Sequence, residues 1–495
     1  MHLETRSPSL KSLLVGGPRH SFRDPGGFVF WAEGRLFRVV KEVCYRDYLA
    51  FDASPTVRRY RDSGRIVSTI SVDPASNDCR GGDGLVNEIY EEYGGKVLLE
   101  HEQLPFPNFP HEWAPEMLHR AVSLTLDLAL DLAGEGLTLK DATPYNVMFR
   151  GSDAVFLDVL SIERRTPGDP IWLSEAQLVR SFLLPLAAWR SFRIPSGEIL
   201  LTHRDGLEPE TVYRWLSVWC RFRAPWLKMV SIPTWLGRRR SAQEPGLYRQ
   251  TPLSNDDQAR FIFTSRLRSL RRTAAKLAPP VASSVWSGYM EGKLSYGSGQ
   301  FEAKENFVIA ALRDFAPRRV LDVGCNDGHF SFLAARNGAE TVAIDLDPVM
   351  VGKVWRRAVA EGIDVLPLVV NLARPTPAIG WNAVEYPSFL DRARKNFDLV
   401  LMLAVIHHLW VTERVPLEEI LETIAGITTD LALIEYVGPQ DPMFRKLTRG
   451  RDHLHQDLTP EAFERMCQAR FDVVRSASLE NSSRRLYLLR VKKPR

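Results

Sequence analysis

The sequence predicts an α/β protein in three parts: an α+β domain over residues 1–200, a helical connector over 201–280 and a doubly wound α/β domain over 281–495. In the last part, strand and helix patterns alternate regularly, the order that builds a parallel sheet covered on both faces. The first part mixes short strand-like runs with one long helical pattern. The connector is rich in tryptophan and arginine and ends at the linker-like pair Pro279-Pro280.

The bulk composition is that of ordinary globular protein. The chain has 495 residues, 45% hydrophobic and 25% charged, and is long enough for two or three domains. Its 64 basic and 60 acidic residues leave a formal charge of +4, which demands no polyanionic partner. No run approaches the about 20 apolar residues of a membrane-spanning helix, so we expect no membrane span.

The five cysteines are scattered, and none belongs to a C-x-x-C pair. This argues against a disulfide framework and against a zinc site, so we expect no metal there and a reducing environment. The apolar run Leu13–Val15 is too short for a signal-peptide core. Together these features predict a soluble, cytoplasmic protein.

The N-terminal domain opens with a predicted hairpin. Strand-like runs at 28–31 and 36–40 flank the turn residues 32–35, and a long helical pattern later covers Leu118–Leu132. After that helix come an acid at Asp141, an asparagine five residues on at Asn146, a short hairpin, and a second acid, Asp158, at a strand tip.

The connector combines aromatic and basic residues. They are Trp215, Trp219, Trp226, Trp235, Arg238, Arg239, Arg240, Arg266, Arg268, Arg271, Arg272 and Lys276. Such a cluster can meet nucleic acid or anionic lipid head groups, but it is more often the solvated face of a helix. No aromatic and basic interleaving of a known RNA-binding module accompanies it, and we expect no nucleic-acid partner.

The first strand of the C-terminal domain leads into a turn of small residues. Residues 318–323 are basic and then apolar, and a helical pattern starts at Phe330. Strand, tight loop and helix form the first unit of a doubly wound sheet, whose ligand crevice lies at the carboxyl ends of the strands. Gly324 and Gly328 let the backbone approach a ligand. Asn326 stands where a middle glycine is usual, and asparagine tolerates left-handed geometry.

A second strand, Thr341–Asp347, places Asp345 near its tip, 23 positions after Asp322. A carboxylate at this point can accept hydrogen bonds from both hydroxyls of a ribose. The loop and this acid predict a nucleotide-binding site. On their own they fit a dinucleotide-dependent enzyme as well.

The motifs of this domain resemble, in order, those of the class I S-adenosylmethionine-dependent methyltransferases. Asp322-x-Gly324-x-x-x-Gly328 and Asp345 are followed by 368–372 and by 397–409, the latter similar to the fourth-strand signature of small-molecule methyltransferases. Further strand patterns lie at 431–437, 471–474 and 485–491. The resemblance implies a Rossmann-like seven-stranded sheet with an antiparallel last strand, and S-adenosylmethionine as the cofactor.

The resemblance also implies roles for single residues. The methionine end of the cofactor would lie against Asp322, Gly324 and Gly328, with Asn326 in the same loop, and the ribose against Asp345. Asn371 would meet the edge of the adenine, although an asparagine there also suits a turn cap.

Methyl transfer needs alignment of the reacting groups and, for most acceptors, removal of a proton. His407 and His408 leave the fourth strand at the edge of the crevice, so we predict a catalytic role for them; the alternative is that they pack or cap the next helix. Glu435, at the tip of the fifth strand, could orient the acceptor. Ahead of the sheet lie residues that form either a cover over the cofactor or plain core: Trp286, Tyr289, Tyr296, Phe301 and Lys304.

The N-terminal motif resembles the catalytic loop of small-molecule phosphotransferases of the kinase-like superfamily. The resemblance implies Asp141 as a base, Asn146 and Asp158 as magnesium ligands, and ATP as a further ligand. No glycine-rich phosphate loop appears, and Arg38 and Lys41 compete for the position of the phosphate-binding lysine. A degenerate binding domain and an active kinase both stay open.

Four motifs along the chain occur together: Leu139-Lys140-Asp141-Ala142-x-x-Tyr145-Asn146, Leu157-Asp158-x-Leu160-Ser161, Pro377-Ala378-x-Gly380-Trp381 and Ile406-His407-His408-Leu409. In this combination the whole chain resembles a bacterial family of long methyltransferases that includes rhizobial nodulation host-specificity proteins. The leading hypothesis is methyl transfer to a small polar or saccharide acceptor, on oxygen. The alternatives are a bifunctional kinase and methyltransferase that modifies a glycan or lipo-oligosaccharide, and a non-catalytic binding protein.

Overall fold

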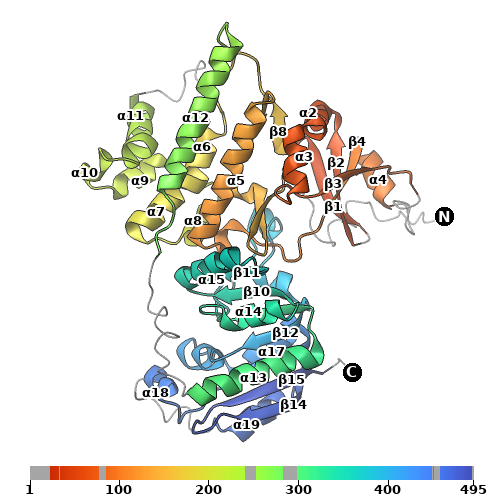
Figure 1. Cartoon of the computed structure of the whole chain (residues 1–495), viewed down its shortest axis with the longest axis vertical. Coiled ribbons are helices and arrows are strands. Elements are labelled where there is room, and N and C mark those ends of the chain that lie inside the picture. The colour runs from red at the N-terminus through yellow and green to blue at the C-terminus, as the bar shows by residue number, and fades with distance from the viewer. Residues whose placement is uncertain are drawn as a thin grey trace, which may run out of the picture.

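The computed structural model describes residues 23–32, 34–76, 85–239, 252–281, 298–448, 450 and 458–492. The chain is elongated: elements from β1 to α12 form the upper part in Figure 1 and elements from α13 to β15 the lower part. Within the described ranges, no helix combines the length and apolarity needed to cross a bilayer.

The N-terminal sheet has the order β1-β2-β4-β3, with every neighbouring pair antiparallel. Its strands are β1 Gly27–Ala32, β2 Arg35–Lys41, β3 Thr69–Val72 and β4 Gly95–His101. The predicted hairpin is confirmed, because β1 and β2 are joined by a tight turn in which Gly34 has a φ of +74°. Three helices accompany the sheet: α2 Glu42–Ala53, α3 Pro55–Asp62 and α4 Leu85–Glu92.

A long buried helix, α5 Pro115–Ala133, follows the sheet and confirms the helical pattern predicted there. Proline at its first position suits a helix start, where the missing N–H has no intrahelical partner. Short paired strands come next: β5 Leu137–Leu139 with β8 Ile162–Arg164, and β6 Val147–Arg150 with β7 Asp153–Phe156. The turns η2 Pro144–Asn146 and η3 Val159–Ser161 lie between them.

A run of helices begins at residue 175, inside the predicted N-terminal domain, and continues through the predicted connector. They are α6 Glu175–Leu178, η4 Val179–Leu183, α7 Leu184–Phe192, α8 Ser196–Thr202, α9 Pro209–Trp215, α10 Val218–Arg221, η5 Leu227–Ser231, α11 Ile232–Arg239 and α12 Asp256–Lys276. The last helix, α12, packs along α5, where Arg271 pairs with Asp127 at 2.7 Å. Part of the basic face is therefore paired with acids of the N-terminal part; the boundaries at 200 and 280 stay predictions.

The C-terminal sheet has seven strands in the order β11-β10-β9-β12-β13-β15-β14. They are β9 Arg319–Val323, β10 Glu340–Asp345, β11 Val365–Val369, β12 Phe397–Met402, β13 Thr428–Tyr436, β14 Phe471–Ser478 and β15 Arg485–Val491. Six of the strands run in the same direction, and β15 runs opposite to them. The predicted seven-stranded sheet with an antiparallel last strand is thus confirmed.

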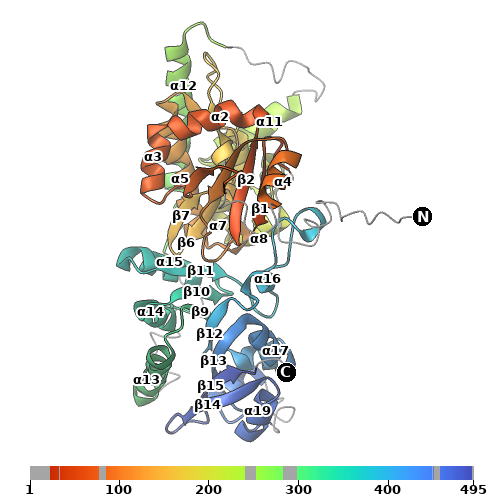
Figure 2. The same cartoon turned by 90° about the vertical axis from the view of Figure 1, so that its right-hand side faces the viewer.

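Helices cover both faces of this sheet. Figure 2 shows α13 Ser298–Phe315, α14 His329–Arg336 and α15 Pro348–Glu361 on one side, and α16 Phe389–Ala393, α17 Leu417–Ile427 and α19 Pro460–Cys467 on the other. The remaining short elements are η6 Trp381–Ala383, η7 His408–Thr412 and α18 Pro442–Thr448. The strand order reverses at β9, so the carboxyl ends of β9, β10 and β12 enclose the crevice in which this class of sheet binds ligands.

The two parts of the chain meet through a buried ion pair. Arg392 of α16 pairs with Glu112, and both side chains are fully buried. The same guanidinium donates to the carbonyl oxygen of Pro107 at 2.6 Å and lies over the rings of Phe106 and Phe109. A second cross-contact pairs Arg356 of α15 with Glu116 at the start of α5.

Candidate functional site

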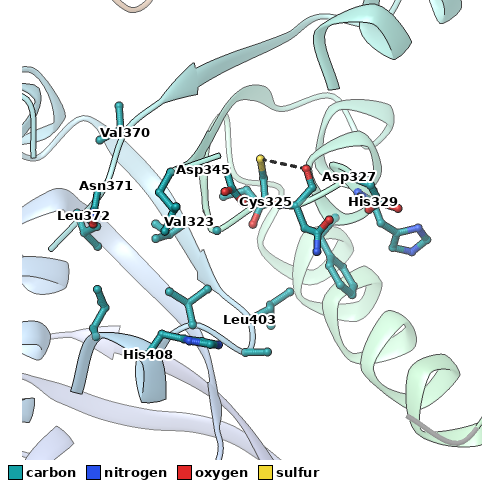
Figure 3. Close-up of a pocket in the computed structure, with 18 of the residues that line it drawn as sticks. Val323, Cys325, Asp327, His329, Asp345, Val370, Asn371, Leu372, Leu403 and His408 are labelled. Carbon is teal, nitrogen blue, oxygen red and sulfur yellow. Dashed lines mark hydrogen bonds between the residues drawn. The ribbon is translucent and has the colours of Figure 1, made fainter. Parts of the chain in front are cut away.

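A cavity of about 260 Å³ opens at the carboxyl ends of β9, β10, β11 and β12. Of the residues predicted to bind a cofactor, those that line it are Asp322, Gly324, Asn326, Asp345 and Asn371. Figure 3 shows Cys325 and Asp327 on one side of the cavity, and Asn371 and His408 on the other. The sheet therefore brings together residues that are far apart in the sequence. Gly328 is not among the lining residues; it is the N-cap residue of α14.

The loop between β9 and α14 depends on left-handed backbone. Gly324 and Gly328 have φ of +68° and +80°, and Asn326 has a φ of +50°. The expectation that Asn326 accepts this geometry is confirmed. A Cβ on Gly324 would lie 2.4 Å from Cγ2 of Val405, so the residue also has to be small. The backbone N–H of Asn326 donates to Oδ2 of Asp345 at 3.0 Å and ties the loop to the next strand.

Two buried carboxyl groups dominate the electrostatics of the cavity. The hydroxyl of Ser331 donates to Oδ2 of Asp322 at 2.6 Å, and burial raises the pKa of Asp322 to about 7. Burial also raises the pKa of Asp345, which accepts hydrogen bonds from the backbone N–H groups of Asn326 and Asp347. A cationic ligand would compensate the cost of keeping these groups ionised away from water.

Acids also outnumber bases among the other charged residues that line the cavity. Asp327 and Glu413 are two further acids that line the cavity. Lys304 also lines the cavity, and its ammonium pairs with the carboxylate of Glu435. His329 also lines the cavity, and burial lowers its pKa, which favours the neutral ring. The lining therefore favours a ligand that carries positive charge.

Asn371 lines the cavity, but the oxygen of its side-chain amide already accepts a hydrogen bond. Oδ1 accepts a hydrogen bond from the backbone N–H of Ala373 at 2.9 Å, as the turn-cap alternative expected. The contact with adenine stays a prediction, and in this geometry it would use the other atoms of the amide.

The two predicted catalytic histidines differ in their surroundings. Their ring centroids are 4.3 Å apart, yet only His408 lines the cavity, whereas His407 is buried beside it. Burial lowers the pKa of His407 to about 3 and also lowers the pKa of His408. Both rings are therefore neutral near pH 7, and only His408 is placed to accept a proton from a molecule in the cavity.

Next to the histidines lies a network of buried charges. Lys304 donates to Oε2 of Glu435 at 2.7 Å, and Arg484 donates to Oε1 of the same carboxylate at 3.1 Å. Arg484 also pairs with Asp441 at 2.7 Å. Burial lowers the pKa of Lys304, while the charge of Glu435 opposes this shift. Since Lys304 reaches the cavity, this network is a functional candidate.

Sequence reasoning had identified Lys304 and Glu435 separately, and it missed Arg484. The only local signal for Arg484 is a basic pair, Arg484-Arg485, at the start of an apolar strand. Of the predicted cover residues, Phe301 and Lys304 line the cavity, and the ring of Phe301 lies 5.1 Å from that of His329. The others, Trp286, Tyr289 and Tyr296, lie outside the described residues.

A second cluster lies in the N-terminal part. Asp158 accepts a hydrogen bond from Arg38 of β2 at 2.8 Å, and Nδ2 of Asn146 donates to the backbone carbonyl of Asp141 at 3.4 Å. Burial raises the pKa of Asp141, and the nearby charge of Asp158 adds to this shift. The three predicted residues therefore meet, with Arg38 as the cation beside them; the ammonium of Lys41 lies instead over the ring of Tyr93.

Comparison with known proteins identifies the C-terminal part and the whole chain. Residues 298–470 match a family described as "Methyltransferase domain". The chain is 30% identical over 487 residues to the nodulation protein NoeA of Rhizobium meliloti (strain 1021), covering 96% of this chain and 97% of NoeA.

Among solved structures, the N-methyltransferase NodS from Bradyrhizobium japonicum WM9 in complex with S-adenosyl-L-homocysteine is similar over 41% of this chain and 91% of its own, with 14% identity and a TM-score of 0.31. The magnesium protoporphyrin IX methyltransferase ChlM from Synechocystis PCC 6803 is similar over 42% of this chain and 94% of its own, with 18% identity and a TM-score of 0.31. The sheet, the family match and the near full-length relative lead to one conclusion: the chain is an S-adenosylmethionine-dependent methyltransferase and belongs to the family of the nodulation protein NoeA.

Proposed function

We propose that the cavity at β9, β10 and β12 holds S-adenosylmethionine and that the enzyme transfers the methyl group to an oxygen of a small polar or saccharide acceptor. The observation that carries this proposal is the pairing of an acid-rich lining with a neutral imidazole, His408, at the edge of the same cavity. The cofactor supplies an electrophilic methyl group on a cationic sulfur.

The residues of the cavity fit such a ligand. Asp345 accepts the ribose hydroxyls, and Asp322 and the loop around Gly324 surround the methionine end. Oδ1 of Asn326 is buried without a hydrogen-bond partner within the described part of the chain, and the residue lines the cavity. A buried acceptor of this kind favours a ligand that brings a donor, such as the ammonium of a methionine moiety.

The chain contributes alignment and proton removal. His408, neutral near pH 7, would accept the proton of the acceptor hydroxyl while that oxygen takes the methyl group; the sulfur–methyl bond would break, and the cofactor would leave as the neutral thioether S-adenosylhomocysteine. His407 packs against His408 and acts as a positioning residue. Lys304, held by Glu435, presents a cation at the cavity and orients polar groups of the acceptor. A saccharide supplies both the hydroxyl and the further polar groups that such a lining would recognise.

Calorimetry tests the cofactor site. Wild type should bind S-adenosylmethionine, and Asp345→Ala should weaken binding by about 10- to 100-fold, because hydrogen bonds to a charged group contribute roughly 1.5–3 kcal/mol. Asp472→Ala, which removes an exposed carboxylate from the edge strand of the same sheet, is the matched control and should bind like wild type. No binding by wild type, or equal binding by Asp345→Ala, would refute the site.

Methyl transfer from radiolabelled cofactor tests the acceptor. Fractionated cell extracts should yield a labelled polar or saccharide product whose methyl group is stable as an ether. Label found only on nitrogen or on protein would contradict the proposed acceptor class, while leaving the cofactor site intact.

A second candidate function rests on the N-terminal cluster. We propose that this part of the chain binds a nucleoside triphosphate, with Asn146 and Asp158 as magnesium ligands, Asp141 beside them and Arg38 in the place of the phosphate-binding lysine; the convergence of these residues supports the proposal. Such a site is compatible with two activities. The domain is either an active kinase with Asp141 as the base, or a domain that binds the nucleotide without transferring its phosphate.

Thermal denaturation separates these outcomes from a purely structural role. ATP with magnesium should raise the melting temperature of wild type but not of Asp158→Ala. Asp153→Ala, which removes an exposed acid from the β6–β7 hairpin that precedes Asp158, should respond like wild type. Absence of a shift in wild type would reject the second function; a shift without phosphate transfer to any fraction would favour the binding domain.

A further inference from the structure

An exposed apolar surface lies on the helices of the predicted connector. Figure 1 shows α9, α10 and α11 grouped at the outer edge of the upper part, away from both large sheets. Their exposed apolar residues are Trp215, Val218, Trp219, Phe222, Ile232 and Leu236, which we call the connector surface. Trp219 is 79% exposed and Val218 is 62% exposed. Single exposed apolar residues are ordinary, but six distributed over three neighbouring helices and the residue that caps α10, Phe222, are not.

The helices that carry the connector surface are packed together. The indole Nε1 of Trp235 donates to the hydroxyl of Tyr213 at 3.1 Å, and the ring of Phe222 lies 5.8 Å from that of Trp235. The guanidinium of Arg221 lies 4.0 Å from the centroid of Tyr213, and the hydroxyl of Ser231 donates to the backbone carbonyl of Arg221. The exposed side chains thus stand on an ordered framework.

The charge of this segment is one-sided. Between Thr211 and Gln243 the sequence has no acid, although the whole chain is nearly balanced. The basic residues in this interval are Arg214, Arg221, Arg223, Lys228, Arg238, Arg239 and Arg240. Of those with described side chains, Arg214, Arg223 and Lys228 are exposed. Glu210 of α9 is an exposed acid on the same helices, so the surface carries an excess of positive charge and not a single sign. A surface that combines exposed tryptophan with such an excess fits a partner that is apolar inside and anionic at its face.

We propose that the connector surface binds the surface of an anionic lipid bilayer. Tryptophan prefers the boundary between head groups and acyl chains, and arginine and lysine can bury their stems there while meeting phosphates. Val218, Ile232 and Leu236 favour lipid over nucleic acid, because aliphatic side chains gain from burial among acyl chains but offer no face for base stacking.

Flotation of the full chain with vesicles tests this proposal. Wild type should float with vesicles of phosphatidylcholine and phosphatidylglycerol in equal amounts, and much less with phosphatidylcholine alone. Trp219→Ser should lower the partition coefficient by about tenfold, since burying a large apolar side chain is worth roughly 1.5–3 kcal/mol. The triple variant Arg214→Glu, Arg223→Glu, Lys228→Glu should lower it by about a hundredfold, because each basic residue near an anionic surface contributes about 1 kcal/mol.

Two controls keep the result specific. Trp381→Ser removes a tryptophan that is 70% exposed on the C-terminal part and should float like wild type. Arg58→Glu with Arg272→Glu and Lys446→Glu makes the same charge change on exposed residues of α3, α12 and α18, and should lose much less binding. The melting temperature of each variant verifies that it is folded.

Several outcomes would overturn the proposal. Wild type that stays unbound to the anionic vesicles does so directly, and equal losses in the test and control variants would reduce the effect to general charge. Binding of a single-stranded oligonucleotide that is lost in the triple variant, without vesicle binding, would assign the surface to nucleic acid instead.

Discussion

At the residue scale, Asp322 shows how the site combines burial with charge. Its carboxyl group is 2% exposed, accepts a hydrogen bond from Ser331, and has a pKa raised to about 7 by burial. The unfolded chain keeps the ordinary value of 3.8. A raised pKa in the folded state means that the group stabilises the fold most in its protonated form. Its contribution is therefore fully present below pH 3.8 and is lost as the pH rises to about 7.

The loss of this stabilisation with rising pH gives the first prediction. Asp322→Asn keeps an acceptor for Ser331 and removes the titration, so its unfolding free energy relative to wild type should rise by about 3 kcal/mol between about pH 5 and pH 8. Urea denaturation of the cofactor-free proteins at the two pH values measures the difference. Asp430→Asn, at a carboxylate of the same sheet whose side chain is 47% exposed, is the matched control. A difference that is flat with pH would contradict the raised pKa.

The histidines give the second prediction. Because His408 lines the cavity and His407 does not, His408→Ala should lower kcat by about a hundredfold or more while cofactor binding stays near wild type. His203→Ala, at an exposed histidine remote from the cavity, serves as the control. An unchanged kcat in His408→Ala would remove the imidazole from the mechanism, and the two histidines would then be packing residues.

At the element scale, the loop between β9 and α14 depends on backbone geometry as much as on side chains. Gly324 and Gly338 both have a left-handed φ, at +68° and +91°, but only Gly324 has no room for a Cβ. Gly338 has nothing within 4 Å of the added atom. Substitutions at these two glycines therefore distinguish the effect of backbone strain from the effect of steric overlap.

The third prediction uses this contrast. Gly324→Ala should lose about 1–3 kcal/mol of stability from strain and should also bind S-adenosylmethionine at least tenfold more weakly, because overlap with Val405 displaces the loop. Gly338→Ala should show only the strain. Denaturation and calorimetry report the two effects. Equal cofactor binding by both variants would mean that the loop tolerates the added atom.

Most elements of the C-terminal sheet could be predicted because the sequence carries them locally. Apolar runs mark the buried strands, and Asn337-Gly338 marks the end of α14. The charge network could not be predicted in the same way. Lys304 and Glu435 are 131 positions apart, and Arg484 reaches Glu435 only because β15 pairs antiparallel with β13. Such contacts depend on strand register, which short-range patterns do not encode.

At the scale of the whole molecule, the N-terminal candidate site lies close to a contact between the two parts of the chain. Tyr145, next to Asn146, packs against Tyr386 with ring centroids 4.8 Å apart, and Arg204 donates to the hydroxyl of Tyr386 at 2.9 Å. Tyr386 belongs to the segment that follows Asn371 of the cofactor cavity. The N-terminal motif therefore packs against the segment that follows the cofactor cavity in the chain. No local sequence pattern could indicate this, because each partner is an ordinary aromatic residue.

The fourth prediction concerns the ion pair that holds these parts together. Arg392→Ala leaves the fully buried carboxylate of Glu112 without its cation, and should cost about 3–5 kcal/mol of stability. Arg490→Ala breaks an ion pair of which both side chains are nearly half exposed, and should cost less than about 1 kcal/mol. Urea denaturation compares the two. The double variant Glu112→Gln with Arg392→Met removes both charges and should recover part of the loss, because the unpaired carboxylate and not the missing contact causes most of it. Equal losses in the three variants would mean that the pair is solvated and the two parts are joined by their apolar contacts alone.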